Sequence, residues 1–509
     1  MRPHALAAAL VAALAAVLSA WIAVRAADPS AFNQDVGWIL IAAERVLDGA
    51  DYGRDWLDAN PPGIFWLSAA PVAIARAVGA PPIAVFDGLV ALAELASLAA
   101  FHRILARGWP ELAAETRLAL CGLIGAALTL LPGYDFGQRE HLVAIAALPY
   151  WLAGARALAG RPLGWRAGLA VGAAAGVGFA IKPFFLLAWA AVEAWIARER
   201  GARATARAEN AAIAGIAVVC AGAVALLTPG YRDVAALAWQ VLGAYDYPWY
   251  AFVLNRAALV LAVALAAARS IRPTPETREL RRVLGVAALA FWVAACLQQR
   301  GWSYHFLPAE LCGAALIAVC AASALARPRA ARFAVPALAG ALLVGGLALA
   351  AQVAHSHSPR PSPVAGLAGI ARDAAGGAPV LFLSTAVGPA FPVVNVSGAS
   401  WASRMSCLWP LPGLYSRKEW ASDPFAYRSR DEMGPAERAL VDAVVEDLAR
   451  WRPALIFVDR RRDRQAIGRS AFDFVAYFSR DPRIAEFFAH YREAGDALSF
   501  RVYQRARTS

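Results

Sequence analysis

Charge and cysteine are scarce in this chain, and lysine is almost absent. Only 17% of its 509 residues are charged, whereas about a quarter are charged in an average soluble domain. The six cysteines form no CxxC pair and show no metal-ligand spacing, so neither a disulfide framework nor a zinc site is indicated. Lys182 and Lys418 are the only lysines, so the formal net charge of +12 comes almost entirely from arginine.

Apolar residues are abundant instead. Hydrophobic residues make up 60% of the chain, and the mean hydropathy is +0.48. This composition is typical of a polytopic α-helical membrane protein. The arginines lie in short loops between apolar runs, where they serve as a topology signal, and nucleic acid is not expected as a partner.

About eleven apolar runs are long enough to be transmembrane helices. They cover about 5–24, 83–101, 117–133, 141–157, 167–181, 183–197, 211–228, 251–268, 283–297, 305–325 and 333–352. The first run also fits a cleavable signal sequence, although its length favours a retained helix. In both cases the chain from residue 28 onward begins on the extracytoplasmic side.

The segment Pro62–Val78 is apolar but carries Pro71 and Arg76, so its topology must be decided separately. If it does not span, the arginine-rich loops fall on one side of the membrane, and the arginine-poor loops fall on the other. The first set is then cytoplasmic by the positive-inside rule. We therefore expect Pro62–Val78 to be a re-entrant or surface helix within a first outer loop, 28–82.

The character of the sequence changes after the transmembrane domain, 1–352. A polar linker with His355 and His357 leads into a region, 353–509, that is long enough for one small α/β domain. The runs 380–383 and 454–458 are predicted strands, and 435–450 and 484–491 are predicted amphipathic helices. Eleven spans from a cytoplasmic N-terminus place this C-terminal domain outside the cytoplasm. Asp459 is followed by three arginines, for which a solvated surface is the ordinary interpretation.

The candidate reactive residues all fall on the expected extracytoplasmic face. They occur in five segments: the first outer loop with Asp35, residues 134–142, the Lys182-Pro183 corner, residues 231–250, and residues 298–305. Charges at membrane depth are costly, and they commonly mark a functional site. The shared face favours one site at the membrane surface.

These segments together resemble the C-type (GT-C) glycosyltransferase superfamily. The likeness is to the bacterial branch that includes lipid A aminoarabinose transferases and is related to protein O-mannosyltransferases. It covers about 28–350 and rests on five features: Asp35 after the first span, a helix rich in Ala and Leu behind it, Asn-Pro-Pro-Gly-Ile-Phe-Trp-Leu (60–67), Arg139-Glu140, and Gly-Trp-Ser-Tyr-His-Phe-Leu-Pro (301–308). In that branch the Pro-Pro segment lies at the membrane surface, in agreement with the arginine argument.

The resemblance implies transfer of a sugar from a polyprenyl-phosphate donor to a lipid, glycan or protein acceptor, at the periplasmic face of the bacterial inner (plasma) membrane. Asp35 is implied as the base or acceptor-orienting carboxylate, and Glu140, with Asp135 as its rival, as the second catalytic acid. The donor phosphate would be held by cations, namely Arg139, Lys182 and Arg300. The remaining candidates bind substrate: His141, Tyr245, Asp246, Trp302, Tyr304 and His305. A divalent metal cofactor is left open, since members of the superfamily differ.

Plainer interpretations stand beside these roles. Asp35 fits an N-cap of the following helix, Lys182 an interfacial anchor, and Arg139-Glu140 a local ion pair. The aromatic residues fit an interfacial belt, and His141 and His305 fit polar helix starts. A transporter or flippase of a lipid-linked or anionic solute is the alternative function, although the sequence has no internal repeat. A structural membrane protein with a partner-binding outer domain is a third.

Overall fold

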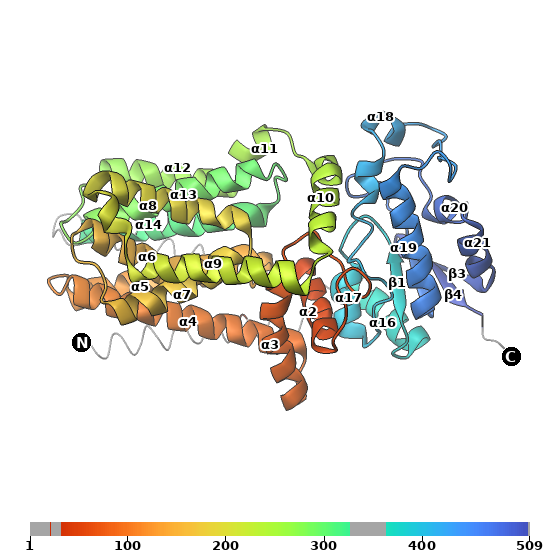
Figure 1. Cartoon of the computed structure of the whole chain (residues 1–509), viewed down its shortest axis with the longest axis horizontal. Helices are drawn as coiled ribbons and strands as arrows, with labels where there is room; N and C mark the ends of the chain where they lie inside the picture. The colour runs from red at the N-terminus through yellow and green to blue at the C-terminus, as the bar shows by residue number, and fades with distance from the viewer. Residues whose placement is uncertain (1–20, 22–31, 326–362, 507–509) are drawn as a thin grey trace. The chain divides into compact units, whose positions relative to one another are not determined.

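Figure 1 shows the computed structural model, which describes Trp21 and residues 32–325 and 363–506. Contacts divide this part of the chain into two compact units. The first contains 78–223 and 247–325, and the second contains 32–77, 224–246 and 363–506. Most of the first outer loop and part of 231–250 are therefore grouped with C-terminal residues. The expected boundary at 353 lies outside the described residues.

The first unit is a helical bundle (Figure 1). Its helices are α4 (Pro82–Gly108), α5 (Ala114–Leu130), α6 (Arg139–Leu158), α7 (Trp165–Ala180), α8 (Leu186–Arg200), α9 (Ala208–Leu227), α11 (Tyr250–Val253), α12 (Arg256–Ser270), α13 (Arg278–Leu297) and α14 (Leu307–Leu325). Helix α6 is the centre of the bundle, since it packs against α4, α7, α13 and α14. Small residues permit close approach: a Cβ on Gly172 of α7 would lie 2.4 Å from the carbonyl oxygen of Glu209 on α9.

Five of the described helices are long and apolar enough to cross a membrane: Pro82–Gly108, Arg139–Leu158, Ala208–Leu227, Arg278–Leu297 and Ser303–Ala324. Four further predicted runs form the shorter helices α5, α7, α8 and α12, of 15 to 17 residues. At 1.5 Å per residue these are roughly 25 Å long, a little less than a hydrocarbon core. Apart from Trp21, the first and last predicted runs lie outside the described residues, and the count of eleven spans stays a prediction.

The second unit joins the first outer loop to a small mixed sheet. The loop supplies α2 (Gln34–Leu47) and α3 (Gly63–Val78), and the middle segment supplies α10 (Tyr231–Val241). The C-terminal residues form α16 (Pro363–Ala375), β1 (Val380–Leu383), α17 (Ala390–Ser397), α18 (Arg417–Trp420), α19 (Pro435–Trp451), β2 (Leu455–Asp459), α20 (Phe474–Phe478), α21 (Pro482–Ala489), β3 (Tyr491–Ala497) and β4 (Phe500–Arg505). The predicted segment Pro62–Val78 is thus helical from Gly63 onward; whether it lies in the membrane surface stays a prediction.

The sheet has the order β1-β2-β4-β3, with β1 and β2 parallel and the other pairs antiparallel. Both strands of the parallel pair are buried along their whole length, which explains why they appear in the sequence as continuous apolar runs. The rings of Phe382 and Phe457 stack across this pair, with 4.4 Å between the ring centres. The hairpin β3–β4 was not predicted, because β3 is a mostly exposed edge strand with no apolar alternation.

Arg45 and Asn395 attach α2 to the C-terminal part of the second unit. Arg45 donates to the carbonyl oxygens of Asp55 and Ser403 at 2.6 Å, and to that of Trp401 at 2.5 Å. Burial is the main reason that the pKa of Arg45 falls to about 10. Asn395 adds a hydrogen bond of 3.0 Å to the carbonyl of Gly37 on α2. The start of the first outer loop is therefore held by residues more than 350 positions away.

Candidate functional site

Three polar side chains meet inside the first unit: Lys182, Glu140 and His305. The Lys182 Nζ lies 3.0 Å from Glu140 Oε1 and 3.2 Å from His305 Nε2. All three side chains are buried. A buried charge that lacks a partner costs several kcal/mol, so the ammonium and the carboxylate stabilise one another. An ammonium can only donate, so Nε2 accepts and the neutral ring of His305 carries its proton on Nδ1.

Local sequence explains these positions. Glu140 lies in the first turn of α6, where the helix dipole favours negative charge. Lys182 is extended, with φ −148° and ψ 123°, and precedes the 3₁₀ turn Pro183–Phe185. A residue before proline avoids the α region, so Pro183 separates α7 from α8 and leaves Lys182 at the break. The predicted turn at Lys182-Pro183 is present.

The segment 299–306 forms an aromatic turn that ends in the 3₁₀ helix Ser303–Phe306. Gly301 has a left-handed φ of 59°, and a Cβ there would lie 2.7 Å from the Tyr247 side chain. Only glycine fits this position without strain. The ring of Tyr304 stacks near Trp302 at 5.7 Å and meets His305 edge-on at 4.7 Å. Two of the predicted substrate-binding aromatic residues therefore surround the histidine that contacts Lys182.

Two more predicted residues reach the same place. The guanidinium of Arg139 lies 5.9 Å from the Tyr304 ring centre. Arg139, Lys182 and Arg300 all interact electrostatically with His305. The three predicted phosphate ligands thus gather around one histidine, with Glu140 as the acid bonded to the lysine.

Asp135 ends the 3₁₀ turn before α6, and His141 lies in the first turn of α6. Asp135 accepts a hydrogen bond of 3.2 Å from Ser303 Oγ, which links it to the aromatic turn. His141 Nδ1 accepts from the Gly137 N–H at 3.1 Å, and its ring packs 5.0 Å from Phe136. The contacts of His141 match the plainer interpretation of a polar residue at a helix start. The contact of Asp135 leaves it at the edge of the cluster.

Asp35 lies in the second unit, in the first turn of α2. The cap of this helix is Asn33, whose Oδ1 accepts the Asp35 N–H at 2.8 Å, so capping does not account for the carboxylate of Asp35. Burial is the main reason that the pKa of the Cys407 thiol rises to about 12, and the carboxylates of Asp58 and Asp35 raise it further. Convergence of Asp35 with Glu140 stays a prediction, since the two residues belong to different units.

Several other carboxylates of the first outer loop have structural partners. Asp48 pairs with Arg76 at 2.6 Å, and Asp55 pairs with Arg54 and Arg450. Asp58 accepts from Trp38 Nε1 at 2.6 Å. Many of the carboxylates in this loop therefore stabilise the loop through ion pairs and hydrogen bonds. Among the described residues, no three His, Cys, Asp or Glu side chains group in a way that could hold a metal ion.

The chain is similar to several solved structures, among them two crystal structures of ArnT from Cupriavidus metallidurans. One is bound to undecaprenyl phosphate, with a TM-score of 0.60, 14% identity, and coverage of 98% of each chain. The other is in the apo state, with a TM-score of 0.57, 14% identity, and coverage of 97% of each chain. The chain has an ArnT-like fold. No protein-family profile matches the sequence, and no curated protein does.

Within the ArnT-like fold, Tyr245 and Asp246 belong to the second unit and lie apart in the chain from the lysine cluster. Tyr245 is buried, and its hydroxyl donates to the carbonyl oxygens of Trp409 at 3.3 Å and Thr385 at 3.5 Å. Its contacts are thus with the C-terminal residues. Sequence inspection did not single out Arg45, Arg404 or Arg450 as ligands of the first loop, because only the fold brings their partners close.

Proposed function

We propose that the chain is a multi-pass glycosyltransferase of the bacterial inner membrane, which takes a sugar from a polyprenyl-phosphate donor. The gathering of Arg139, Lys182 and Arg300 around His305 carries this proposal. Cations at the ends of apolar helices need an anionic partner, and a polyprenyl phosphate offers a phosphate with an apolar tail. The ArnT-like fold supports the same class, since one ArnT structure holds undecaprenyl phosphate.

The chemistry makes specific demands on such a site. An acceptor oxygen attacks the anomeric carbon of the sugar, the bond from that carbon to the donor phosphate breaks, and the polyprenyl phosphate leaves with an additional negative charge. Fixed cations at the phosphate stabilise this charge as it develops. A carboxylate near the acceptor takes its proton. We assign the phosphate to Arg139, Lys182 and Arg300, and the acceptor side to Asp35.

Glu140 has a supporting part in this scheme. Its carboxylate compensates the buried ammonium of Lys182 at 3.0 Å before the donor binds, which keeps the lysine charged and in place. We place the reaction on the periplasmic side, because the arginine-poor loops carry all of these residues. The acceptor is a lipid, a glycan or a protein.

Binding of undecaprenyl phosphate to the purified protein in nanodiscs tests the site. We expect Lys182→Met and Arg300→Ala each to weaken binding by roughly 10- to 100-fold, the range set by a lost hydrogen bond to a charged group. Arg269→Ala is a matched control, because Arg269 is exposed near the end of α12 and has no hydrogen bond or ion pair among the described residues. Equal binding by all variants would contradict the assignment.

Incubation with undecaprenyl-phosphate pentoses and hexoses labelled in the sugar tests the reaction. Release or transfer of the labelled sugar supports the enzyme. Movement of intact labelled donor across the membrane of a sealed vesicle, with no cleavage, would instead support a flippase.

A further inference from the structure

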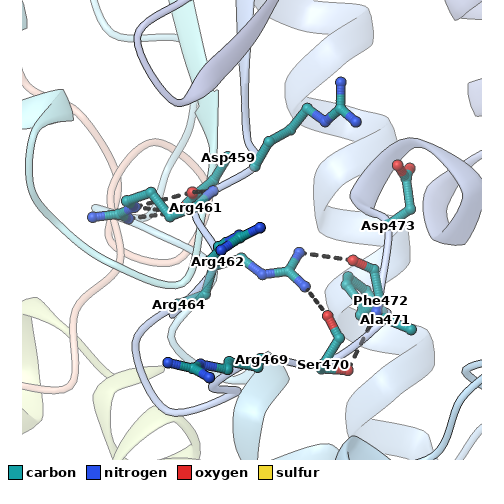
Figure 2. Close-up of a pocket in the computed structure, with 10 residues that line it drawn as sticks. Asp459, Arg461, Arg462, Arg464, Arg469, Ser470, Ala471, Phe472 and Asp473 are labelled. Atoms are coloured by element: carbon teal, nitrogen blue, oxygen red, sulfur yellow. Dashed lines mark hydrogen bonds and ion pairs between the residues drawn. The ribbon is translucent and has the colours of Figure 1, made fainter.

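Five arginines line a pocket in the C-terminal part of the second unit: Arg460, Arg461, Arg462, Arg464 and Arg469. The pocket has a volume of about 480 Å³ and is formed by the single segment 459–473 (Figure 2). None of the proposed donor-site residues lies in this segment. Like charges repel one another, so the balance of positive and negative charge in the pocket decides which ligands it can bind.

The pocket lies where the parallel strands of the sheet end. It begins at Asp459, the last residue of β2, and Ser384 follows the last residue of β1. Ser384 Oγ donates to Asp459 Oδ2 at 2.8 Å, which joins the two strand ends. In α/β folds, ligands commonly bind outside the carboxyl ends of parallel strands. The position of the pocket is therefore one that ligands favour.

The acidic residues of the pocket are already engaged. Arg461 Nη2 contacts Asp459 Oδ2 at 2.5 Å, and the Arg461 N–H adds a bond of 2.9 Å to Asp459 Oδ1. Asp473 caps α20, with its Oδ1 accepting the Ala476 N–H at 2.8 Å. Figure 2 shows the Arg461–Asp459 pair on one side of the pocket and Asp473 on the other. Neither carboxylate offsets the charge of the remaining arginines by direct contact.

The remaining arginines have side-chain N–H groups that find no acceptor among the described residues. Arg462 and Arg469 are exposed and form no hydrogen bond or ion pair with the part of the chain that the structure describes. Arg464 is 7% exposed; its two terminal nitrogens donate to the carbonyls of Phe472 and Ser470, while its Nε is buried with no partner in that same part of the chain. The guanidinium of Arg460 lies 4.0 Å from Asp496, the one ion pair that it forms with the described residues.

The loop that carries these arginines is closed on itself. The Arg464 N–H donates to the Gly468 carbonyl at 3.0 Å, and the Gly468 N–H donates back at 2.8 Å. Ala466 and Gly468 take left-handed φ values of 62° and 56° to complete the turn. Thr385 Oγ1 also donates to the Gln465 carbonyl at 2.7 Å. The guanidinium groups therefore project from a fixed backbone, which lowers the entropy lost on binding a ligand.

We propose that this pocket binds a phosphate monoester. Guanidinium groups are planar and donate in pairs to phosphate oxygens, and a dianionic phosphate matches Arg462 and Arg469, which form no ion pair with the described residues. The phosphate belongs either to a soluble molecule or to a lipid headgroup. The site is separate in sequence from the proposed donor site, so each can fail without the other.

The test measures binding of radiolabelled inorganic phosphate to the full-length protein in phosphatidylcholine nanodiscs. We expect saturable binding that Arg462→Ala combined with Arg469→Ala weakens by roughly tenfold or more, since two charge-assisted contacts are lost. Arg438→Ala is the matched control, because Arg438 is an exposed arginine of α19 with no such contact among the described residues. The double variant should bind undecaprenyl phosphate as tightly as the wild type, which separates the pocket from the donor site.

Competition then identifies the source of the phosphate. Displacement of the label by soluble glucose 1-phosphate alone assigns a soluble ligand, and displacement by phosphatidic acid added to the nanodisc assigns a lipid headgroup; either result supports the pocket. Unchanged thermal unfolding of the double variant shows that it is folded, as exposed residues predict. Equal phosphate binding by the wild type and the double variant, or equal losses in the double variant and Arg438→Ala, would overturn the proposal.

Discussion

Lys182 and Glu140 form a buried ion pair of 3.0 Å that joins the break after α7 to the first turn of α6. Most of α6 and all of α7 separate the two residues in the sequence, and the fold places His305 on the same ammonium. The lysine at the proline break and the glutamate at the helix start thus form one buried ion pair. This pair determines how the proposed phosphate site keeps a cation inside an apolar bundle.

We expect Glu140→Gln to destabilise the protein by about 3–5 kcal/mol, because it leaves the ammonium of Lys182 buried without its carboxylate. Lys182→Met should have a similar effect. The double variant should recover part of the loss, since it removes both charges. Thermal unfolding of the four proteins in one detergent gives the coupling free energy, and strictly additive losses would show that the two residues do not interact.

Asp35→Asn should abolish sugar transfer while membrane expression stays unchanged. The cap of α2 is supplied by Asn33, so the exchange of Asp35 for its amide leaves the helix start intact. Transfer from a polyprenyl-phosphate sugar is the measurement.

Asn33→Ala is the paired control for that experiment. It removes the cap and should cost about 1 kcal/mol of stability, with transfer retained in proportion to folded protein. Full transfer activity in Asp35→Asn would remove Asp35 from the mechanism.

Arg45→Ala should destabilise the second unit by about 2–4 kcal/mol, because three carbonyl oxygens lose their charged donor. Arg45→Lys should restore little, since an ammonium cannot reach all three acceptors from one planar group. Unfolding can be followed by protease cleavage within 363–506. If lysine restores full stability, charge rather than hydrogen-bond geometry holds α2.

The lowered pKa of Asp55 predicts that the protein loses stability in acid. Burial alone would raise its pKa, but Arg54, the Asp51 N–H and Arg450 outweigh burial and hold the pKa of Asp55 well below its ordinary value. A lowered pKa in the folded state means that the stabilisation is complete above the unfolded pKa, about 3.9, and is lost as the pH falls below it. We expect the wild type to lose about 1–2 kcal/mol from this residue between pH 5 and pH 2.

Asp55→Asn should lack that part of the acid sensitivity and should be less stable than the wild type at pH 7. Asp51→Asn is the matched comparison in the same loop, since Asp51 is exposed and its pair with Arg54 is in water. Urea unfolding at several pH values measures both. Identical pH dependence in the wild type and Asp55→Asn would contradict the assignment.

Much of the helical order follows from the sequence, because long apolar runs and proline breaks are local signals. The runs at 141–157 and 283–297 became α6 and α13, and Pro183 marked the end of α7. The buried strands β1 and β2 were also visible as short apolar runs. The edge strand β3 was not visible, because an exposed strand rich in charge lacks both the apolar run and the alternation.

The candidate site was also predicted from the sequence only in part. Glu140, Lys182 and His305 were named from helix ends and motifs, and the fold brings them together. The structural use of Asp55 and Asp58 could not be read from the sequence, because Arg450 lies 395 positions from Asp55 and Trp38 lies 20 positions from Asp58. Local pattern shows that a carboxylate is present, whereas only tertiary contacts show what it does.

The attachment of α2 by Arg45 has a consequence for protein engineering. A chimera that exchanges residues 363–506 for those of another protein would remove or alter two of the three carbonyl acceptors of Arg45, those of Trp401 and Ser403, from a helix encoded near the opposite end of the gene. Swaps should therefore carry 32–77 and 363–506 as one cassette, even though almost three hundred residues separate them.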